Sequence, residues 1–513
     1  MLRSASTMAD AEHFEYLFGE DADLYRRTLR LLFSLACEKI FPDRSIQGGY
    51  SIANAYWYWI QGIEAVHHNE LEMIKAEMLQ LVARDVKVHE EKRPYKEVLQ
   101  YFIEKEQFIA AKLLSSRIPI GGMVDVKVCM IEEKPHFRLS FFPVFESLGK
   151  LKKIPFDLQI YPKGGVMLTY GSRFVDQPAI TSAILELREW SKKTGVNCSA
   201  DLCDVEEGDG AQKLYIHACE VRLENKISEL AKQIAKRAES NRLRVVCIAG
   251  PTASGKTTFS HKLSLALRTE GVSSMPLTVD HYYLPLDRQP KYQIRHNRAD
   301  VDYDSIESMD VELVQEHIMA LTHGETVMTP IYNMKTGYRE HPGKEMKLEE
   351  GGTLIIEGIH ALNPNYTSKI PENEKFKVYI SPIMTLQLDD FNVCKTTDHR
   401  LARRMSRDYL FRGNNAAKTL SMWSNVRRGE HTWIFPHQNE ADFIFNSAMH
   451  CELPILKGRL DQLLRTVPPD NDNFVKCSHL LAVLDTFPTW QESPVASTSI
   501  LREFIGGSAF NVH

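Results

Sequence analysis

One nine-residue segment, GPTASGKTT at positions 250–258, constrains the fold of this chain more than any other feature. It fits the phosphate-loop pattern G-x-x-x-x-G-K-[ST] and directly follows the apolar run 243–249. Glycines let backbone N–H groups turn inward around phosphate oxygens, and the helix that follows presents its partial positive charge to them. The segment therefore predicts a strand, a phosphate-binding loop and a helix, in that order.

The residues of this loop have separate roles in binding ATP. Lys256 would reach the outer phosphates, and Thr257 would offer its hydroxyl to Mg²⁺, which prefers oxygen ligands and nucleotide phosphates. The predicted ATP-binding residues of the loop are Gly250, Pro251, Thr252, Ala253, Ser254, Gly255, Lys256, Thr257 and Thr258. A glycine-rich turn without chemical meaning is the alternative, and the strand–loop–helix context argues against it.

After the loop, strand-like and helix-like segments alternate, which predicts an α/β fold with a parallel sheet covered by helices. Most of the strand candidates are continuous apolar runs, as expected where both faces of a sheet are buried. The candidates are 243–249, 276–279, 353–356, 376–380 and 443–445.

The first half of the chain has a different pattern and predicts an α+β domain. Apolar residues recur at helical spacing over 25–35 and 68–84, and the segment 124–170 has the alternating pattern of antiparallel strands. One connecting helix is expected over 220–239, with a boundary at Ser240-Asn241. The predicted division is a first domain at 1–240, a phosphate-loop domain at 241–465 and a C-terminal appendage at 466–513.

Composition limits the class of protein. The formal net charge is -5, which lacks the basic excess of a nonspecific nucleic-acid binder, and no apolar run is long enough to span a membrane. The nine cysteines are scattered without CxxC pairs, which favours reduced thiols in a cytoplasmic protein. The opening MLRSASTM has no apolar run, so a secretory signal is not expected and a transit peptide is only weakly indicated.

Two acidic residues follow predicted strands of the parallel sheet. Asp280 comes after the second strand, at the carboxyl edge where open α/β sheets bind ligands, and could orient or deprotonate an attacking hydroxyl. Glu357 follows the apolar run 353–356 and could hold Mg²⁺-bound water. A loop-capping role for Asp280 and a surface position for Glu357 are the alternatives.

Arginines form a stripe on one predicted helix. The four residues stand at i, i+3, i+4 and i+7 and are Arg400, Arg403, Arg404 and Arg407, with Arg412 continuing the cluster. Guanidinium groups on one face repel one another, and a triphosphate would offer them charge-assisted contacts. A solvated face paired with Asp398 and Asp408 is the alternative.

Several segments in order resemble the uridine kinase and phosphoribulokinase family of phosphate-loop kinases. These are GPTASGKTT, VDHYYLPLD, DYDSIESMD, TPIYNM, LIIEGIHALNP and TDHRLARRMSRD, between about 242 and 457. The resemblance implies that Asp280 is the catalytic base, that Asp304 binds ribose hydroxyls, and that lid arginines clamp phosphates. The implied acceptor-binding residues are Tyr283, Tyr303, Asp304, Tyr332 and Arg339, and the lid arginines are Arg404, Arg407 and Arg412.

The chain departs from this family at two positions and resembles one subfamily in particular. Gly337 stands where uridine kinases carry a pyrimidine-reading histidine, and Asn414 replaces a later lid arginine, so pyrimidine specificity does not follow. The segments KTGYRE, WSNVRRGEHTWIFPHQNEADFIFNSA and SILREFIGGSAF resemble kinases that follow a threonyl-tRNA-synthetase-like region. RRTLRLLFSLACEKIFP and RPYKEVLQYF resemble that synthetase's accessory editing region. Its HxxxH signature is absent, so no zinc hydrolase is expected.

The leading hypothesis is an ATP-dependent kinase that uses Mg²⁺ and phosphorylates a hydroxyl of a nucleoside-like acceptor. Asp280, Lys256, Arg404 and Arg407 are the predicted catalytic residues, while Thr257 and Glu357 are predicted to hold the metal. The alternatives are a kinase for another alcohol or a sugar phosphate, and a nucleotide-dependent RNA-binding or regulatory protein. A homo-oligomer is possible, and no membrane partner is expected.

Overall fold

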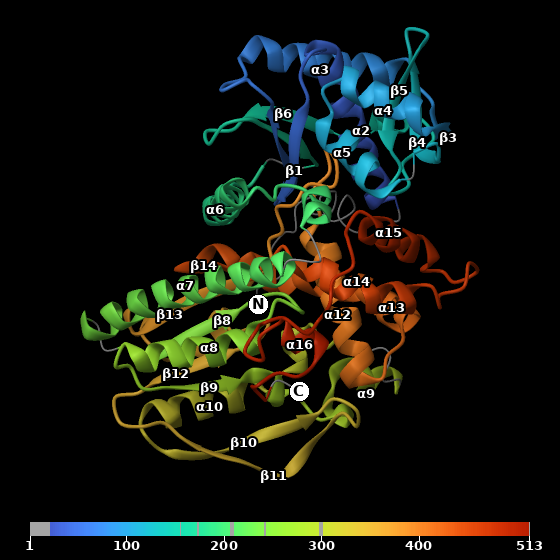
Figure 1. The fold of residues 1–513 in the computed structure, drawn as a ribbon. Helices are drawn as coiled ribbons and strands as arrows, with labels where there is room; N and C mark the ends of the chain where they lie inside the picture. The colour runs from blue at the N-terminus through green and yellow to red at the C-terminus, as the bar shows by residue number, and fades with distance from the viewer. Residues whose placement is uncertain are drawn as a thin grey trace. The chain divides into compact units, whose positions relative to one another are not determined.

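The computed structural model describes residues 21–118, 120–153, 155–171, 174–205, 210–240, 243–296 and 301–511. The segment MLRSASTM, Asn241 and Val512 lie outside these ranges. The chain forms two compact units, and each contains segments that are far apart in the sequence (Figure 1). The first unit comprises Met1–Glu206, Met384–Lys395 and Val475–Pro488, and the second comprises Glu207–Ile383, Thr396–Phe474 and Thr489–His513.

The first unit combines two antiparallel sheets with helices, in agreement with the α+β prediction. One sheet has the order β1-β2-β7-β6, and the other has the order β3-β4-β5. The strands are β1 (Ile46–Ile52), β2 (Ala55–Ile60), β3 (Val88–Pro94), β4 (Met123–Ile131), β5 (Lys134–Leu139), β6 (Phe156–Ile160) and β7 (Val166–Tyr170). The helices are α2 (Ala22–Ile40), α3 (His68–Ala83), α4 (Tyr95–Glu104), α5 (Phe108–Arg117), α6 (Pro178–Thr194) and α15 (Phe474–Asp485).

The first unit has two apolar cores, and the larger one also includes residues of β3 and β4. In the larger core, α2 and α3 cover the four-stranded sheet through residues such as Leu29, Phe33 and Ile74, all of which are buried. In the smaller core, α4 and α5 cover the three-stranded sheet through residues such as Phe102 and Phe137. The apolar spacing over 25–35 and 68–84 therefore marked the buried faces of α2 and α3.

The segment Met384–Lys395 lies in the second half of the sequence but belongs to the first unit. Arg30 of α2 is buried, and its Nη2 donates a 2.7 Å hydrogen bond to the carbonyl oxygen of Phe391. Tyr50 donates its hydroxyl to the carbonyl oxygen of Thr385 at 3.0 Å. The carboxylate of Asp390 accepts the backbone N–H of Ala110 in the first turn of α5 at 3.0 Å. Buried polar contacts therefore fix this segment within the first unit.

The second unit is built on a five-stranded parallel sheet of order β14-β13-β8-β12-β9, which confirms the predicted fold class. The strands are β8 (Val245–Ala249), β9 (Ser274–Thr278), β12 (Thr353–Glu357), β13 (Lys375–Ser381) and β14 (Phe443–Asn446). Each agrees with a predicted apolar run to within a few residues. A two-stranded antiparallel ribbon, β10 (Thr326–Asn333) and β11 (Tyr338–Lys347), lies outside this sheet (Figure 1).

Helices cover both faces of the parallel sheet. From β8 to β9 the chain moves across the sheet in one direction, and from β9 to β12 it moves back in the other. Because both crossovers are right-handed, they place α8 and α10 on opposite faces of the sheet. The helices of this unit are α7 (Ala211–Ser240), α8 (Lys256–Thr269), α9 (Pro290–Arg295), α10 (Val311–Thr322), α11 (Pro364–Thr367), α12 (Thr396–Arg412), α13 (Ala416–Gly429), α14 (Glu452–Leu464) and α16 (Arg502–Ile505). The carboxyl ends of β8, β9 and β12 thus meet at one edge.

The boundaries of the two compact units differ from the domain boundaries expected at residues 240 and 465. The long helix α7 contains the predicted connecting helix and packs on α8, so the second unit begins near residue 207. The last part of the chain contributes to both units, because Val475–Pro488 belongs to the first and Thr489–His513 to the second. The three-domain division stays a prediction. Among the described residues, no helix has the length and hydropathy needed to cross a membrane.

A buried ion pair in the first unit provides a test of its folding. Glu38 accepts hydrogen bonds from Arg138 Nη2 at 2.7 Å and from the Tyr101 hydroxyl at 2.8 Å, and both charged side chains are buried. Burial favours the neutral carboxyl, but Arg138 and His136 hold the pKa of Glu38 well below its usual range. We expect Arg138→Met to lower the free energy of unfolding by about 3–5 kcal/mol, because it strands a buried carboxylate.

Urea unfolding, with hydrogen exchange in β4 and β5 as the local readout, measures this change. The control is Lys150→Met, which removes an exposed ion pair with Glu146 and should cost about 0–1 kcal/mol. A loss below 1 kcal/mol for Arg138→Met would show that the pair does not stabilise the unit.

Candidate active site

The phosphate loop lies between β8 and α8, as the sequence predicts. Ala253 and Gly255 have φ angles of 58° and 89°, so the chain turns through the left-handed region twice before α8 begins. A Cβ on Gly250 would overlap the carbonyl oxygen of Ile380 in β13. Glycine is therefore required where the loop leaves β8 beside the neighbouring strand.

Side chains outside the loop hold its backbone carbonyl groups. Three consecutive carbonyl oxygens accept hydrogen bonds: Thr252 from Arg400 Nε at 2.9 Å, Ala253 from Arg403 Nη1 at 3.2 Å and Ser254 from Ser447 Oγ at 2.7 Å. The C=O and N–H of a trans peptide point in opposite directions, so the N–H groups of Ala253 and Gly255 point away from these side chains. This arrangement leaves backbone N–H groups for the concave face of the loop.

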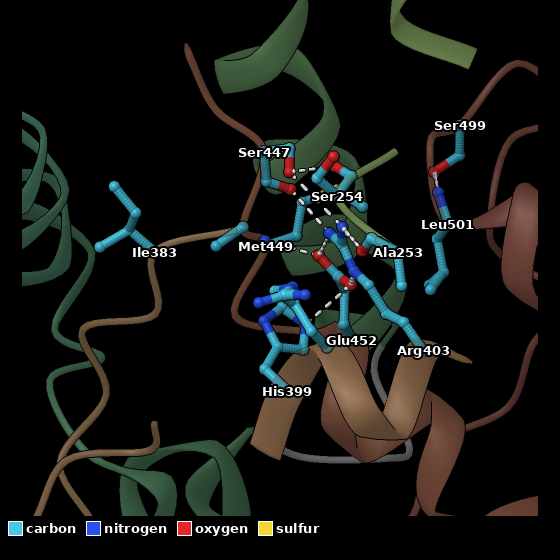
Figure 2. Close-up of polar contacts among 12 residues, drawn as sticks. Ala253, Ser254, Ile383, His399, Arg403, Ser447, Met449, Glu452, Ser499 and Leu501 are labelled. Atoms are coloured by element: carbon cyan, nitrogen blue, oxygen red, sulfur yellow. Dashed lines mark hydrogen bonds and ion pairs between the residues drawn. The ribbon is translucent and has the colours of Figure 1, made fainter. Parts of the chain in front are cut away.

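Arg403 is a buried structural residue of this arrangement. Its Nε and Nη2 donate to Glu452 at 2.6 and 2.7 Å, and Nη2 also donates to the carbonyl oxygen of Ser447 at 2.9 Å (Figure 2). His399 contacts the same carboxylate at 2.9 Å. Although burial opposes it, Arg403 lowers the pKa of Glu452 to about 2, so the carboxylate remains charged.

Arg400 has the same kind of environment, which bears on the interpretation of the arginine stripe. It is 1% exposed and forms a bidentate ion pair with Glu430, in addition to its bond with the loop. Arg400 and Arg403 thus hold the loop from outside and are neutralised by buried glutamates. Both guanidinium groups are buried and paired with carboxylates, so this structure does not support phosphate binding by these two members of the predicted row, and that part of the prediction stays untested.

The other three arginines of α12 are held less completely. Arg404 Nε and Arg412 Nη1 each lie 3.3 Å from opposite oxygens of Asp408. Arg407 Nη2 lies 3.5 Å from the Thr252 hydroxyl of the loop. Burial, together with the charge of Arg412, lowers the pKa of Arg407 to about 10. Arg407 therefore lies at the loop, where an added anion would stabilise its charge.

A lysine and a glutamate lie together at the carboxyl edge of the sheet. Lys256 is buried, and its Nζ donates to the Pro251 carbonyl oxygen at 3.3 Å. Burial lowers its pKa, while Asp280 and Glu357 act in the opposite direction. Glu357 Oε1 accepts from the hydroxyls of Thr278 at 2.7 Å and Thr257 at 3.2 Å. The lysine and both predicted metal-holding side chains are therefore adjacent.

Glu357 is buried, Asp280 is half-buried, and the two acids are close enough to influence each other. Burial and the charge of Asp280 raise the pKa of Glu357 to about 7. Within the described ranges, neither Glu357 Oε2 nor Asp280 Oδ1 has a hydrogen-bond partner. A Cβ on Gly358 would overlap Val279 and lie 3.4 Å from Asp280 Oδ1. The absence of a side chain at Gly358 therefore leaves room for Asp280 beside the end of β12. Unpartnered buried oxygens at this edge suit a ligand with hydroxyl or cationic groups.

The predicted acceptor side is aromatic and acidic. Tyr283 donates its hydroxyl to the Tyr303 carbonyl oxygen at 2.8 Å, and its ring lies 5.3–5.4 Å from the rings of Tyr303 and Tyr332. Burial raises the pKa of Asp304 to about 6, although Arg404 acts against this shift. A Cβ on Gly429 would overlap the Asp304 side chain, so α13 closes directly on this residue. The structure brings Asp304 and the three tyrosines into one region.

Arg339 has a different environment from the other predicted acceptor residues. Its Nη2 donates to Asp310 at 2.9 Å, and its Nε donates to the Tyr283 carbonyl oxygen at 3.2 Å. It therefore holds the backbone that carries Tyr283, and its role toward an acceptor stays a prediction. The hydroxyl and N–H of Thr258, assigned to ATP from the sequence, both contact Glu503.

Sequence reasoning missed several residues of this region. They are the arginine partners Glu430 and Glu452, the loop contact Glu503, and the buried pair His360 and Tyr366. Isolated carboxylates in helical segments have no spacing signal, so their partners become visible only in three dimensions. Glu503 lies in SILREFIGGSAF, a segment that the sequence singled out without assigning it a role.

Comparison with known proteins agrees with this geometry. The profile described as "Phosphoribulokinase / Uridine kinase family" matches residues 245–453, from β8 to the start of α14. The C-terminal half contains a phosphate-loop kinase domain of this family. The matched region is about 41% of the chain's length, and of the first unit it includes only the segment Met384–Lys395.

Individual relatives match stretches of similar length. A uridine kinase of Saccharomyces cerevisiae is 25% identical over 204 residues, which cover 40% of this chain and 36% of that protein. A uridine kinase of Oceanobacillus iheyensis is 25% identical over 223 residues, which cover 43% of this chain and 95% of that protein. A solved structure of a possible uridine kinase from Bacillus stearothermophilus is 18% identical, with a TM-score of 0.31, and covers 44% of this chain and 100% of its own. The chain thus spans about a third of the yeast relative's length.

The shifted carboxyl of Asp304 gives a stability test with a definite sign. An unfolded Asp titrates near 3.9, and the folded pKa of Asp304 is about 6, so the penalty for its charge develops as pH rises from 4 to 6. We expect Asp304→Asn to raise the free energy of unfolding by about 1–3 kcal/mol at pH 8, with little gain near pH 4. Urea unfolding at both pH values measures the difference.

Asp310→Asn is the matched control, since it removes the ion pair with Arg339 and should destabilise at pH 8. An equal gain for Asp304→Asn at both pH values would contradict the assignment of this penalty to Asp304.

Proposed function

We propose that this protein is an ATP-dependent kinase that transfers the γ-phosphoryl group to a hydroxyl of a nucleoside-like acceptor. The observation that carries the proposal is the position of Asp280, whose unpartnered carboxylate oxygen is buried among the described residues beside Glu357 and Lys256. Phosphoryl transfer needs a group that accepts or orients the acceptor's hydroxyl proton next to the site of the terminal phosphate. Asp280 meets this requirement at the edge of the sheet that carries the phosphate loop.

The reaction needs one proton acceptor and several positive groups. The acceptor hydroxyl transfers its proton to Asp280 as its oxygen bonds to the γ-phosphorus, and the bond from that phosphorus to the β–γ bridging oxygen breaks. ADP leaves with the electron pair of that bond. Lys256, Arg404 and Arg407 would stabilise the charge that spreads over the phosphoryl oxygens, with Arg412 on the nucleotide. Their preorganisation lowers the barrier because water need not reorient.

The residues present fit a magnesium ion. Glu357 has one oxygen that lacks a partner among the described residues, and the Thr257 hydroxyl lies 3.2 Å from the other oxygen. Oxygen donors of this kind, with nucleotide phosphates, are what Mg²⁺ prefers. When bound, the ion would neutralise phosphate charge, and Thr257 and Glu357 would hold it. Glu357 also fixes the Thr278 hydroxyl and thereby joins the ends of β9 and β12.

The acceptor is proposed to lie against the tyrosines and Asp304. The ring of a nucleobase could stack on Tyr283, Tyr303 or Tyr332, and stacking of this kind tolerates different bases. Asp304 would accept hydroxyl groups of the sugar, and Arg339 would support this side. Gly337 has no side chain to read a base, so pyrimidine specificity does not follow, and a sugar phosphate or another alcohol stays an alternative acceptor.

The remaining predictions concern the protein around this domain. We propose that the first unit is related to the accessory region of threonyl-tRNA synthetase, on the basis of RRTLRLLFSLACEKIFP and RPYKEVLQYF. The unpatterned cysteines support a reducing compartment, which we propose is the cytoplasm. Light scattering would measure whether the protein forms a homo-oligomer.

ATP consumption with a panel of acceptors tests the function. With Mg²⁺, we expect nucleosides to stimulate ADP formation by the full chain, and Lys256→Ala to abolish it. Asp280→Asn should lower kcat about 10²–10⁴-fold, because it removes the proton acceptor and keeps the side chain's shape. A coupled ADP assay and mass spectrometry of the acceptor measure both effects.

Asp461→Asn is the control, because this exposed acid pairs with Arg465 on α14 and should leave turnover unchanged. Stimulation by sugar phosphates alone would assign the kinase to another acceptor. Salt-sensitive tRNA binding without any phosphorylated product would support the RNA-binding alternative and contradict the proposal.

A further inference from the structure

Two buried side chains near the candidate site have no role in the function proposed above. His360 follows Glu357 by three residues and is 1% exposed; the backbone of Asp304 lies against its ring, and within the described part of the chain at least one ring nitrogen has no hydrogen-bond partner. Tyr366 in α11 is also 1% exposed, and its hydroxyl likewise has no partner in the described ranges. An unsatisfied buried polar group destabilises the folded state, so two such groups near one site call for a ligand.

The surroundings place both side chains on the acceptor side. Burial raises the pKa of Tyr366, and the charge of Asp280 raises it further, so the ring lies near the proposed base. Burial lowers the pKa of His360 to about 4, with the backbone of Asp304 and the carboxylate of Asp302 acting against this shift. His360 is therefore neutral at pH 7, and its closest polar surroundings include the proposed sugar-binding acid.

We propose that His360 and Tyr366 form a recognition pair for an uncharged acceptor that carries several hydroxyl groups. This inference rests on the proposed kinase function and specifies how its acceptor is chosen. A neutral imidazole offers one donor and one acceptor, and a phenol offers either, so the pair matches neighbouring hydroxyl groups. Asp280, Asp302 and Asp304 make the region acidic, which disfavours an acceptor that already bears a phosphate.

Two nearby cations are themselves paired with acids, and Arg404 acts on Asp304, so these cations offset the acidity only in part. Arg339 is paired with Asp310 at 2.9 Å, and Lys291 is paired with Asp302 at 3.1 Å. Selection through hydrogen bonds to hydroxyls is effective, because an analogue that lacks the hydroxyl leaves the protein groups buried and unpaired.

Steady-state kinetics of His360→Leu and Tyr366→Phe test the pair. We expect each variant to raise the KM for the preferred acceptor about tenfold or more, and to change the KM for ATP less than twofold. Each should also discriminate less against deoxy analogues of the acceptor. The control is Tyr282→Phe, because the Tyr282 hydroxyl already has a partner, His317 Nδ1, at 2.9 Å. Its acceptor KM should stay within twofold of wild type.

The outcomes separate this proposal from the proposed function. A wild-type protein without acceptor-stimulated turnover contradicts the kinase function itself. An active wild type, with acceptor KM values within twofold for both variants, contradicts the recognition pair and leaves the function standing. If His360→Leu does not fold, His360→Gln and calorimetric binding of the acceptor to Tyr366→Phe decide the same question.

A second, independent observation concerns the end of the chain. Glu503 of α16 is buried, and its Oε2 accepts from the Thr258 hydroxyl at 3.1 Å and from the Thr258 N–H at 3.4 Å. Its Oε1 lies 3.6 Å from Arg407 Nη1. The segment is fixed there, because Ser406 donates to the Phe504 carbonyl oxygen at 2.8 Å and Ile500 lies against Gly255.

We infer that Glu503 competes with nucleotide phosphates for Thr258 and Arg407. The N–H groups in the first turn of α8 form an anion-binding position, and the carboxylate of Glu503 already occupies part of it. An ATP molecule that uses the same N–H and guanidinium must displace this carboxylate or accept its repulsion. The C-terminal segment thereby sets the affinity of the loop for nucleotide.

Calorimetric titration with ADP and ATP tests this competition without requiring turnover. We expect Glu503→Gln to lower the Kd about three- to tenfold, because it removes the negative charge and keeps the side chain's shape. Glu492→Gln is the control on the same segment, since Glu492 pairs with Arg459 at 2.7 Å, and its Kd should not change. An unchanged or higher Kd for Glu503→Gln would overturn the inference and indicate that Glu503 supports the loop.

Discussion

The candidate active site depends on the way in which the outer side of the phosphate loop is held. The loop turns its carbonyl groups toward Arg400, Arg403 and Ser447 and so leaves its N–H groups for an anion. Two buried arginines would be very costly alone, but Glu430 and Glu452 neutralise them in direct ion pairs. The loop's shape therefore depends on charges that lie on its outer side.

The interior of the site has the opposite character. Burial raises the pKa of Glu357 and Asp304, and one oxygen each of Asp280 and Glu357 is not satisfied by protein groups in the described ranges. Such an arrangement costs folding free energy, and functional sites commonly tolerate this cost because ligands remove it. The packed sheet of the second unit, whose strands β8 and β12 are fully buried, provides the necessary stability.

The sequence predicted the parallel sheet and the phosphate loop well, because both have local patterns. All five strands coincide with predicted strand segments, most of which are apolar runs, and the loop coincides with the phosphate-loop motif. The ribbon β10–β11 was not predicted, because it contains Pro330 and Pro342 and β11 is mostly exposed, so apolar spacing gives no signal. The roles of Arg400 and Arg403 could not be read either, since Glu452 lies about fifty residues away in the sequence and no spacing rule connects them.

The two units are formed by interleaved segments of the chain, and this limits how the protein can be divided into fragments. Met384–Lys395 leaves the kinase domain between β13 and α12, and its Phe391 carbonyl is held by Arg30 within the first unit. No single cut of the polypeptide can separate the two units, since a fragment that begins at Glu207 still carries this segment without its buried partners. A gene rearrangement that transplanted only the kinase half would expose an apolar loop immediately before the helix that shapes the phosphate site. Neither unit is therefore a contiguous stretch of the sequence.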